Sequence, residues 1–306
     1  MQVIERMTEM IGLSPAKSSI PFKCIHVVDC GTYNRKKIEY QVNQRCIPAF
    51  LLVPKGEGPF PAVLIHHQHN REFHLGKSEV CGLKGNPLQA FGPALAQSGI
   101  VVLSPDAVCF EERRINSKGT DENGEQDDWD YFLALCNGIL SGESLAKIAI
   151  EDAMGAISVL NGLGFVDHSK IGCMGHSYGG NTTYFTAAFD PRIRFALASG
   201  SVVSYQYRIE NSTGIEKASI IPGFTKEFEI VDVIKAIAPR EFMIVCATED
   251  KWSKDAPEIY KIAKSHYVSK GAEENLQLKQ YPGGHVLTQE RFDFIVNWIV
   301  SQAARA

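Results

Sequence analysis

The pentapeptide Gly175-His176-Ser177-Tyr178-Gly179 is the feature that most constrains the fold of this chain. It follows a short apolar run at 170–174, typical of a buried strand, and precedes 180–189, typical of a helix. The turn between them must be tight, and glycines two residues before and after the serine suit it because they have no Cβ to clash. The helix would point its N-terminal amides and positive dipole end at Ser177. The pattern predicts a nucleophilic serine at a strand-to-helix turn; the alternative is a glycine-rich turn with an idle serine.

A serine in this position needs a histidine to take its proton and a carboxylate to orient that histidine. On such a fold both follow the serine along the chain, the acid first, each after a strand. The apolar run 241–247 leads into Glu249 and Asp250. The alternating run 276–281 leads into His285. We predict His285 as the base and Asp250 as its orienter; the adjacent Glu249 is the alternative, because the two acids cannot both point at one histidine.

The tetrahedral intermediate also needs two amide donors for its oxyanion. One is the amide of Tyr178, the residue after the serine. The other should come from the loop after the apolar run 61–67, where Gln68 and His69 are both possible donors. We favour Gln68.

Four histidines at positions 66, 67, 69 and 74 raise the question of a metal site. His66 and His67 should point to opposite faces of a strand, and no acidic residue lies beside them at ligand spacing. We therefore expect one buried histidine that bonds loop backbone, with the others lining the cleft. No metal and no cofactor is predicted.

The bulk composition sets the size and the excluded partners. The 306 residues, 44% of them hydrophobic, suffice for one large core, so we predict a single domain over 1–306. A net charge of −4 predicts no nucleic-acid partner and no binding to anionic membranes. The sequence contains no run of 18 apolar residues, so we predict no membrane span.

The beginning of the chain and the cysteines indicate the compartment. Residues 1–10 combine acidic residues with apolar spacing of three and four, which is typical of an amphipathic helix rather than a signal peptide. The eight cysteines show no CxxC pairing, and several lie in predicted strands. We predict a cytoplasmic protein with reduced cysteines.

The pattern of apolar residues along the chain predicts an α/β fold. Alternation at 24–30, 37–42 and 47–54 favours an antiparallel N-terminal part. From residue 61 onward buried strands alternate with helices, which predicts a mostly parallel sheet with helices on both faces. Further strands are expected at 100–105, 171–175, 195–199, 243–247 and 276–281, and helices at 88–97, 144–163, 183–189, 257–269 and 289–304.

Two segments, near 111–143 and 204–229, are predicted insertions. The first begins with the polar stretch 111–130, whose composition predicts a mobile surface loop; a lid or an oligomer contact is the alternative. The second lies between the serine and the acid, where it can cover the cleft and shape the substrate pocket. A structural packing loop is the other possibility for it.

Together these residues resemble the α/β-hydrolase superfamily, and within it the dienelactone-hydrolase-like and acetyl-xylan-esterase-like branch. The motifs that carry the resemblance, over about residues 45–303, are His66-His67-Gln68-His69, 73–79, Ser104-Pro105-Asp106 with Glu112-Arg113-Arg114, 175–180, 188–193, Ile237-Ala238-Pro239-Arg240, Asp250 and Gly284-His285. Dienelactone hydrolases proper use a cysteine nucleophile, whereas this chain carries Ser177. Polysaccharide deacetylases are typically exported, and no export signal is predicted here.

The resemblance implies a carboxylic-ester hydrolase that acts on a small-molecule ester through a serine acyl-enzyme, without a cofactor. We expect short acyl groups, such as acetyl, because the candidate pocket residues include few long aliphatic side chains. A homo-oligomer is possible. The alternatives are a C–C hydrolase, amidase or thioesterase with the same triad, or a ligand-binding protein on the same fold.

Overall fold

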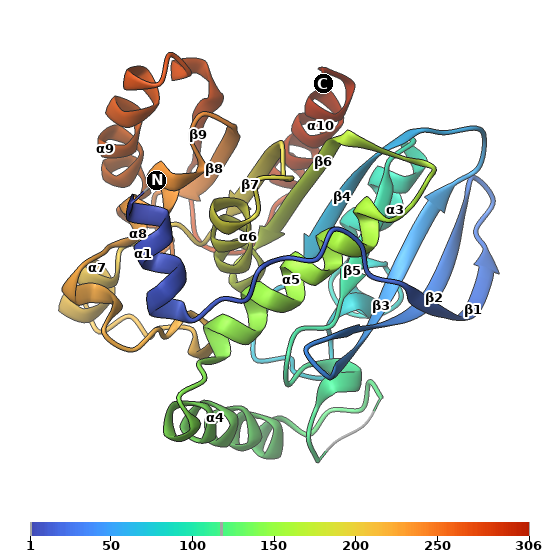
Figure 1. The fold of residues 1–306 in the computed structure, drawn as a ribbon, viewed down its shortest axis with the longest axis horizontal. Coiled ribbons are helices and arrows are strands. Elements are labelled where there is room, and N and C mark those ends of the chain that lie inside the picture. Colours follow the sequence, from blue (N-terminus) through green and yellow to red (C-terminus); the bar gives the residue numbers. More distant parts are fainter. Residues whose placement is uncertain (1, 117–118, 306) are drawn as a thin grey trace.

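A computed structural model describes residues 2–116 and 119–305. Its centre is a nine-stranded sheet with the order β1-β2-β3-β5-β4-β6-β7-β8-β9 (Figure 1). The strands are β1 (Phe22–Asp29), β2 (Tyr33–Val42), β3 (Arg45–Pro54), β4 (Phe60–His66), β5 (Val101–Pro105), β6 (Val166–His176), β7 (Phe195–Ser199), β8 (Glu241–Ala247) and β9 (Leu276–Tyr281). β1, β2, β3 and β5 pair antiparallel, and β4 to β9 run parallel.

Helices cover both faces of this sheet. They are α1 (Gln2–Ile11), α2 (Lys77–Val80), α3 (Phe91–Gln97), α4 (Gly124–Ser141), α5 (Leu145–Asn161), α6 (Tyr178–Phe189), α7 (Tyr205–Glu210), α8 (Ile230–Ile237), α9 (Ala256–Ser269) and α10 (Gln289–Arg305). Short 3-10 turns lie at Pro87–Gln89, Glu111–Arg113, Lys217–Ser219, Phe224–Lys226 and Glu273–Asn275. The predicted helix at 88–97 is therefore a 3-10 turn followed by α3, because the chain leaves helical geometry at Ala90.

The core divides between the two faces because strand side chains alternate in direction. On β4, Ala62 and Leu64 belong to the core cluster that includes residues of α1, α5, α6, α8 and α9, whereas Val63 and Ile65 belong to the one that includes residues of α3 and α10. The predicted α/β-hydrolase fold, with its antiparallel N-terminal part, is confirmed. Since every strand joins one sheet, we keep a single domain over 1–306 as our interpretation.

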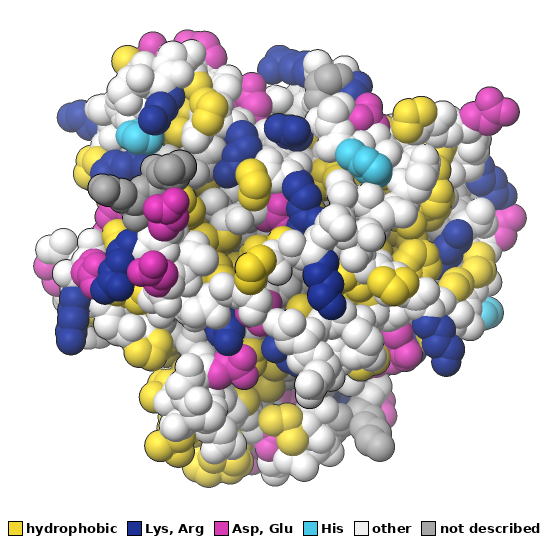
Figure 2. Space-filling model, in the orientation of Figure 1, with side chains coloured by type: hydrophobic (Ala, Val, Ile, Leu, Met, Phe, Trp, Pro, Cys, Tyr) yellow, Lys and Arg dark blue, Asp and Glu magenta, His cyan; other side chains and the backbone are white. Residues whose placement is uncertain are grey.

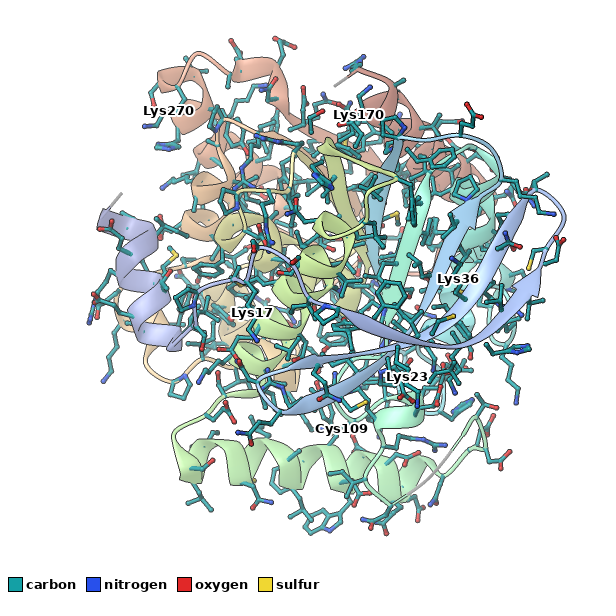
Figure 3. The ribbon with its side chains drawn as sticks, turned by 45° about the vertical axis from the view of Figure 1, so that its right-hand side comes forward. Lys17, Lys23, Lys36, Cys109, Lys170 and Lys270 are labelled. Carbon is teal, nitrogen blue, oxygen red and sulfur yellow. The ribbon has the colours of Figure 1, made fainter. Side chains whose placement is uncertain are left out.

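The prediction of a mobile polar loop over 111–130 was wrong at both ends of the segment, and its residues 117–118 lie outside the described residues. Its first residues form a 3-10 turn, and its last seven belong to α4, which packs below the sheet (Figure 1). Ion pairs and hydrogen bonds neutralise the buried charges: Arg114 donates to Asp127 over 2.7 Å, and Asn116 donates to Asp130 over 2.8 Å. The polar and charged residues that suggested a solvated loop thus bond to one another inside the protein. Cys109 lies in the space between α4 and the sheet (Figure 3).

The outer side of α4 is apolar. Trp129, Phe132, Ile139 and Leu140 are exposed, and Figure 2 shows hydrophobic side chains gathered along this lower edge of the molecule. In the described part of the chain, no single helix is both long and apolar enough to cross a membrane. The consecutive helices α4 and α5 reach that hydropathy only together, and they are bent by 97°.

Candidate active site

Ser177 sits where β6 ends and α6 begins, in a conformation that L-amino acids rarely adopt. Its φ is 56° and its ψ −123°, which costs on the order of 1–3 kcal/mol and is typical of functional sites. A Cβ on Gly175 would overlap the backbone of Gly179, and a Cβ on Gly179 would overlap the carbonyl of His66. Both glycines are therefore required for the turn to pack against β4. The serine hydroxyl is carried at the N-terminus of α6, as the sequence predicted.

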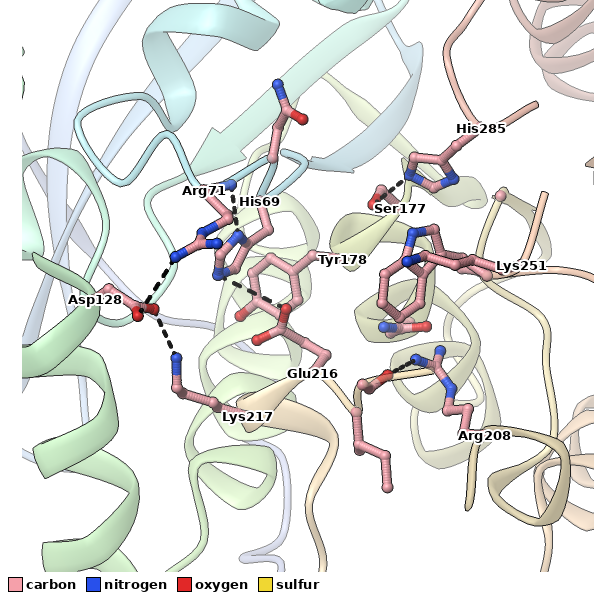
Figure 4. A pocket seen from close by; sticks show the side chains of 17 residues that line it. His69, Arg71, Asp128, Ser177, Tyr178, Arg208, Glu216, Lys217, Lys251 and His285 are labelled. Carbon is pink, nitrogen blue, oxygen red and sulfur yellow. Dashed lines mark hydrogen bonds and ion pairs between the residues drawn. The ribbon is translucent and has the colours of Figure 1, made fainter. Parts of the chain in front are cut away.

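The structure brings together the three residues predicted as a triad. His285 Nε2 lies 2.8 Å from Ser177 Oγ, and His285 Nδ1 lies 3.0 Å from Asp250 Oδ1 (Figure 4 shows the first contact). Ser177 follows β6, Asp250 follows β8 and His285 follows β9, so all three stand at the carboxyl edge of the parallel strands. These contacts allow proton transfer from the serine to the histidine.

Asp250, rather than Glu249, faces the histidine. The Asp250 carboxylate is buried and accepts hydrogen bonds from the Ser253 hydroxyl (2.7 Å) and the Trp252 amide (2.9 Å). Burial alone would raise the pKa of this carboxyl, but the hydrogen bonds from His285, Ser253 and Trp252 hold the pKa below its ordinary value. Asp250 is therefore ionised at neutral pH. Glu249 is exposed, and its amide donates to the carbonyl of Gly283.

His176, the residue before the serine, packs directly behind the histidine of the triad. The His176 and His285 ring centroids are 4.9 Å apart, and His176 Nδ1 lies 3.0 Å from Ser199 Oγ. Burial lowers the pKa of His176 to about 3, so this ring is neutral at physiological pH. His176 therefore places a second imidazole behind His285 without adding charge, a contact that sequence reasoning missed.

The second oxyanion donor stays a prediction. The side chain of Gln68 is engaged away from the serine, since Nε2 donates to both Glu79 oxygens over 3.1 Å and Oε1 accepts from Gln89. His69 lines the same pocket as Ser177 and Tyr178. The backbone amides of Gln68 and His69 are both candidates, and of these two residues only His69 borders the cavity.

The histidines at 66, 67, 69 and 74 play separate parts. His66 and His67 are both buried, and His67 bonds loop backbone as expected: Nδ1 lies 2.7 Å from the Gln68 carbonyl, and Nε2 accepts from the Ala107 amide. Burial lowers the pKa of His66 to about 3 and that of His67 to about 4. The expectation that the others line the cleft holds for His69 only, because His74 points toward Glu122.

One trio of carboxylates in the described residues has the spacing of a metal site, but an ammonium fills it. Lys77 Nζ lies 2.6 Å from Asp106, 2.5 Å from Glu111 and 2.6 Å from Glu112. Lys77 is completely buried, and these carboxylates raise its pKa above the ordinary value against the effect of burial. The cluster ties α2 to the loop after β5.

A pocket of about 670 Å³ opens above Ser177. Its lining residues come from the loop after β4, α4, the elbow, the 204–229 segment and the two triad loops: His69, Asn70, Arg71, Asp128, Ser177, Tyr178, Asn181, Gly200, Ser201, Arg208, Gly214, Ile215, Glu216, Lys217, Lys251, Trp252 and His285 (Figure 4). The 204–229 segment thus shapes the pocket, as predicted. Among the side chains that line the pocket are four cations and two carboxylates, whereas Tyr205, Tyr207, Ile220 and Ile221 of the same segment do not line it.

Comparisons with known proteins find similar hydrolases. A model of the prolyl oligopeptidase family (Peptidase_S9) matches residues 143–251. A protein of Bacillus subtilis (strain 168) described as "Putative hydrolase YtaP" is 27% identical over 263 residues, which are 82% of this chain and 83% of that protein.

Solved structures share the fold at lower identity. A structure described as a putative acetyl xylan esterase from Bacteroides fragilis NCTC 9343 superimposes with a TM-score of 0.77 and 17% identity, over 92% of this chain and 74% of that one. Acetyl xylan esterase from Paenibacillus sp. R4 gives a TM-score of 0.63 and 14% identity, over 98% and 93% of the two chains.

The sheet order and the turn at Ser177 give this chain the α/β-hydrolase fold, and the predicted resemblance to that superfamily is confirmed. The comparisons support a hydrolase, and several of the similar solved structures are esterases.

Proposed function

We propose that this protein is a serine hydrolase that cleaves carboxylic esters through an acyl-enzyme on Ser177. The observation that carries the proposal is the pair of contacts from His285, 2.8 Å to Ser177 Oγ and 3.0 Å to Asp250 Oδ1. The similar structures described as acetyl xylan esterases support an ester substrate.

The reaction takes two steps. His285 removes the Ser177 proton as Oγ attacks the ester carbonyl, and the oxyanion accepts hydrogen bonds from the Tyr178 amide and an amide of the loop at Gln68 and His69. His285 then returns the proton to the leaving alcohol. Water, deprotonated by His285, hydrolyses the acyl-enzyme, while Asp250 holds the imidazole in the required tautomer. The chemistry is complete with these side chains.

Labelling and substitution of the serine test the mechanism. A fluorophosphonate should form one adduct on Ser177, located by mass spectrometry of the digested protein. Ser177→Ala should abolish labelling and lower kcat for 4-nitrophenyl acetate by a factor on the order of 10³ or more, as loss of a triad nucleophile does elsewhere. An adduct on another serine, or full activity in the variant, would refute the assignment.

We further propose short acyl groups, from acetyl to butyryl. Among the described residues that line the pocket, Ile215 is the only long aliphatic one, Tyr178 and Trp252 are aromatic, and six others are charged. A long acyl chain gains about 0.8 kcal/mol per buried methylene only where it meets apolar walls. A series of 4-nitrophenyl esters should therefore give a kcat/KM that peaks at four carbons or fewer. A maximum at eight carbons or more would overturn this specificity.

The same triad can act on thioesters and amides, so these bonds need a direct comparison. Acetyl thioesters and acetanilides, assayed beside 4-nitrophenyl acetate, should give lower kcat/KM after correction for their uncatalysed rates.

A further inference from the structure

One wall of the pocket carries a buried cation that no described carboxylate neutralises. Arg208, in α7, is only 5% exposed and lines the pocket with Ser177. Its Nη1 donates to the Gly214 carbonyl over 3.0 Å, and its guanidinium lies 5.5 Å from the centroid of the Trp252 ring. Neither partner carries a charge. A buried guanidinium without an anion is unfavourable by several kcal/mol, so such a group is more often paired.

The two carboxylates of the pocket are already engaged elsewhere. Asp128 lies 2.9 Å from Lys217 Nζ, and Glu216 accepts a hydrogen bond of 2.5 Å from the Tyr131 hydroxyl. Asp128 stands on the far side of the pocket from Arg208, and Glu216 lies between the two (Figure 4). The side near His285 therefore keeps an excess of positive charge.

Lys251 adds to this excess. It follows Asp250 directly, its Nζ lies 4.7 Å from the Trp252 ring, and within the described chain it forms no ion pair. In Figure 4 Lys251 lies between His285 and Arg208, and both cations contact the Trp252 ring on the side of the pocket that holds His285. Contact of both with the indole of Trp252 restrains them toward the cavity.

We infer that Arg208 and Lys251 form a binding site for an anionic group, a carboxylate, on the ester substrate. This inference rests on the proposed esterase function and narrows its substrate class to esters that carry a negative charge. A guanidinium presents parallel donors that match a carboxylate, and charge-assisted bonds of this kind are roughly twice as strong as neutral ones. The carboxylate can belong to the acyl part or to the alcohol part of the ester.

Matched pairs of charged and neutral esters test the inference and separate these two sources. On the acyl side, monomethyl succinate is compared with dimethyl succinate by methanol release. On the alcohol side, acetoxyacetate is compared with its methyl ester by acetate release. On at least one side, the wild-type protein should prefer the anion by tenfold or more in kcat/KM. No preference on either side would overturn the inference.

Arg208→Gln should lower kcat/KM for the preferred anionic ester by ~10–100-fold, which corresponds to the loss of a hydrogen bond to a charged group, and change the neutral ester by less than threefold. Lys226→Gln is the matched control, because Lys226 is an exposed cation of the same segment that does not line the pocket. It should keep the preference. Equal losses on charged and neutral esters in Arg208→Gln would mean a structural role only, and would overturn the inference.

Two further measurements remain decisive if Arg208→Gln does not fold. Lys251 is exposed, so Lys251→Gln should fold normally and reduce the preference for the anion in the same direction. An unchanged preference in that variant would remove Lys251 from the site.

Binding can be measured without turnover. Calorimetry of succinate with Ser177→Ala should show binding that Lys251→Gln in the same background weakens severalfold; Arg208→Gln, where it folds, should weaken it at least tenfold. If succinate binds in this way but no ester is cleaved, the esterase proposal fails and the anion site stands. If the protein cleaves neutral esters and labels with fluorophosphonate but binds no succinate, the anion site fails alone.

Discussion

At the scale of single residues, the neighbours Glu249 and Asp250 show how environment assigns a role to one of two similar acids. Asp250 is 2% exposed and contacts His285, whereas Glu249 faces solvent. Asp250→Asn should lower kcat by a factor on the order of 10⁴, the effect of this change in a serine protease, because the amide favours the wrong histidine tautomer. Glu249→Gln should stay within threefold of wild type. Steady-state kinetics on 4-nitrophenyl acetate measures both.

The reverse ranking would move the orienting role to Glu249. Equal and small losses would contradict the triad as a whole, and circular dichroism of both variants checks that neither effect comes from unfolding.

The buried histidines predict a dependence of stability on pH. Burial lowers the pKa of His66 to about 3, well below its ordinary value, so the unfolded chain binds this proton first as the pH falls. The stabilisation is complete above pH 6.5 and is lost toward pH 3, by about 1.4 kcal/mol per pH unit. His66→Leu removes this pH-dependent contribution to the free energy of unfolding. The free energy of unfolding of wild type relative to the variant should therefore fall by about 2 kcal/mol between pH 6.5 and 5.

Urea unfolding of both proteins at several pH values measures this difference. Taking the difference cancels groups that titrate in both, such as Glu79, whose pKa burial raises to about 7. A difference that stays constant over this range would show that folding does not shift the pKa of His66.

At the scale of elements, sequence reasoning was most reliable where a segment contacts the core along one regular face. The parallel strands and the helices α5, α9 and α10 were predicted to within a few residues, because their apolar side chains are continuous or periodic. The whole of α4 was missed: its first seven residues were predicted as loop because they are polar, and no helix was predicted for the rest. α8 was also missed, although its apolar residues at 230, 233, 234 and 237 follow helical spacing.

For the candidate site, sequence order and strand ends indicated Ser177, Asp250 and His285, which the structure brings together. The charged pocket wall could not be predicted in the same way. Arg208 and Lys251 are distant in the chain, and only the fold places both beside Trp252.

The loop after β5 depends on the buried ammonium of Lys77. Lys77→Met would leave Asp106 and Glu111 without their cation in a dry environment, so the free energy of unfolding should fall by about 3–5 kcal/mol. The matched control is Lys37→Met, which removes a partly exposed partner of Glu112 and should cost at most about 1 kcal/mol. Urea unfolding measures both. Similar small losses would show that water or protonation replaces the ammonium without cost.

At the scale of the whole molecule, the N-terminal helix packs against elements that lie far from it in the sequence. α1 packs against α6, the helix that begins at the serine, and Met7 is completely buried in the same core cluster. Met7→Ala should lower the free energy of unfolding by about 2–5 kcal/mol, because a cavity remains where the side chain was. Val3→Ala, on the exposed side of α1, should change it by less than about 0.5 kcal/mol. Equal effects would mean that α1 does not dock in solution.

The strained backbone at Ser177 implies that the proposed nucleophile is held in place at a cost in the free energy of unfolding. A φ of 56° suits glycine far better than any residue with a Cβ. Ser177→Gly should therefore unfold at higher urea concentration than Ser177→Ala, although glycine normally weakens a protein by roughly 0.5–1 kcal/mol relative to alanine. Both variants lack the Ser177 hydroxyl, so a thermal or urea comparison reads the conformational cost alone. Glycine at position 177 would then relieve the strained backbone, although it removes the proposed nucleophile.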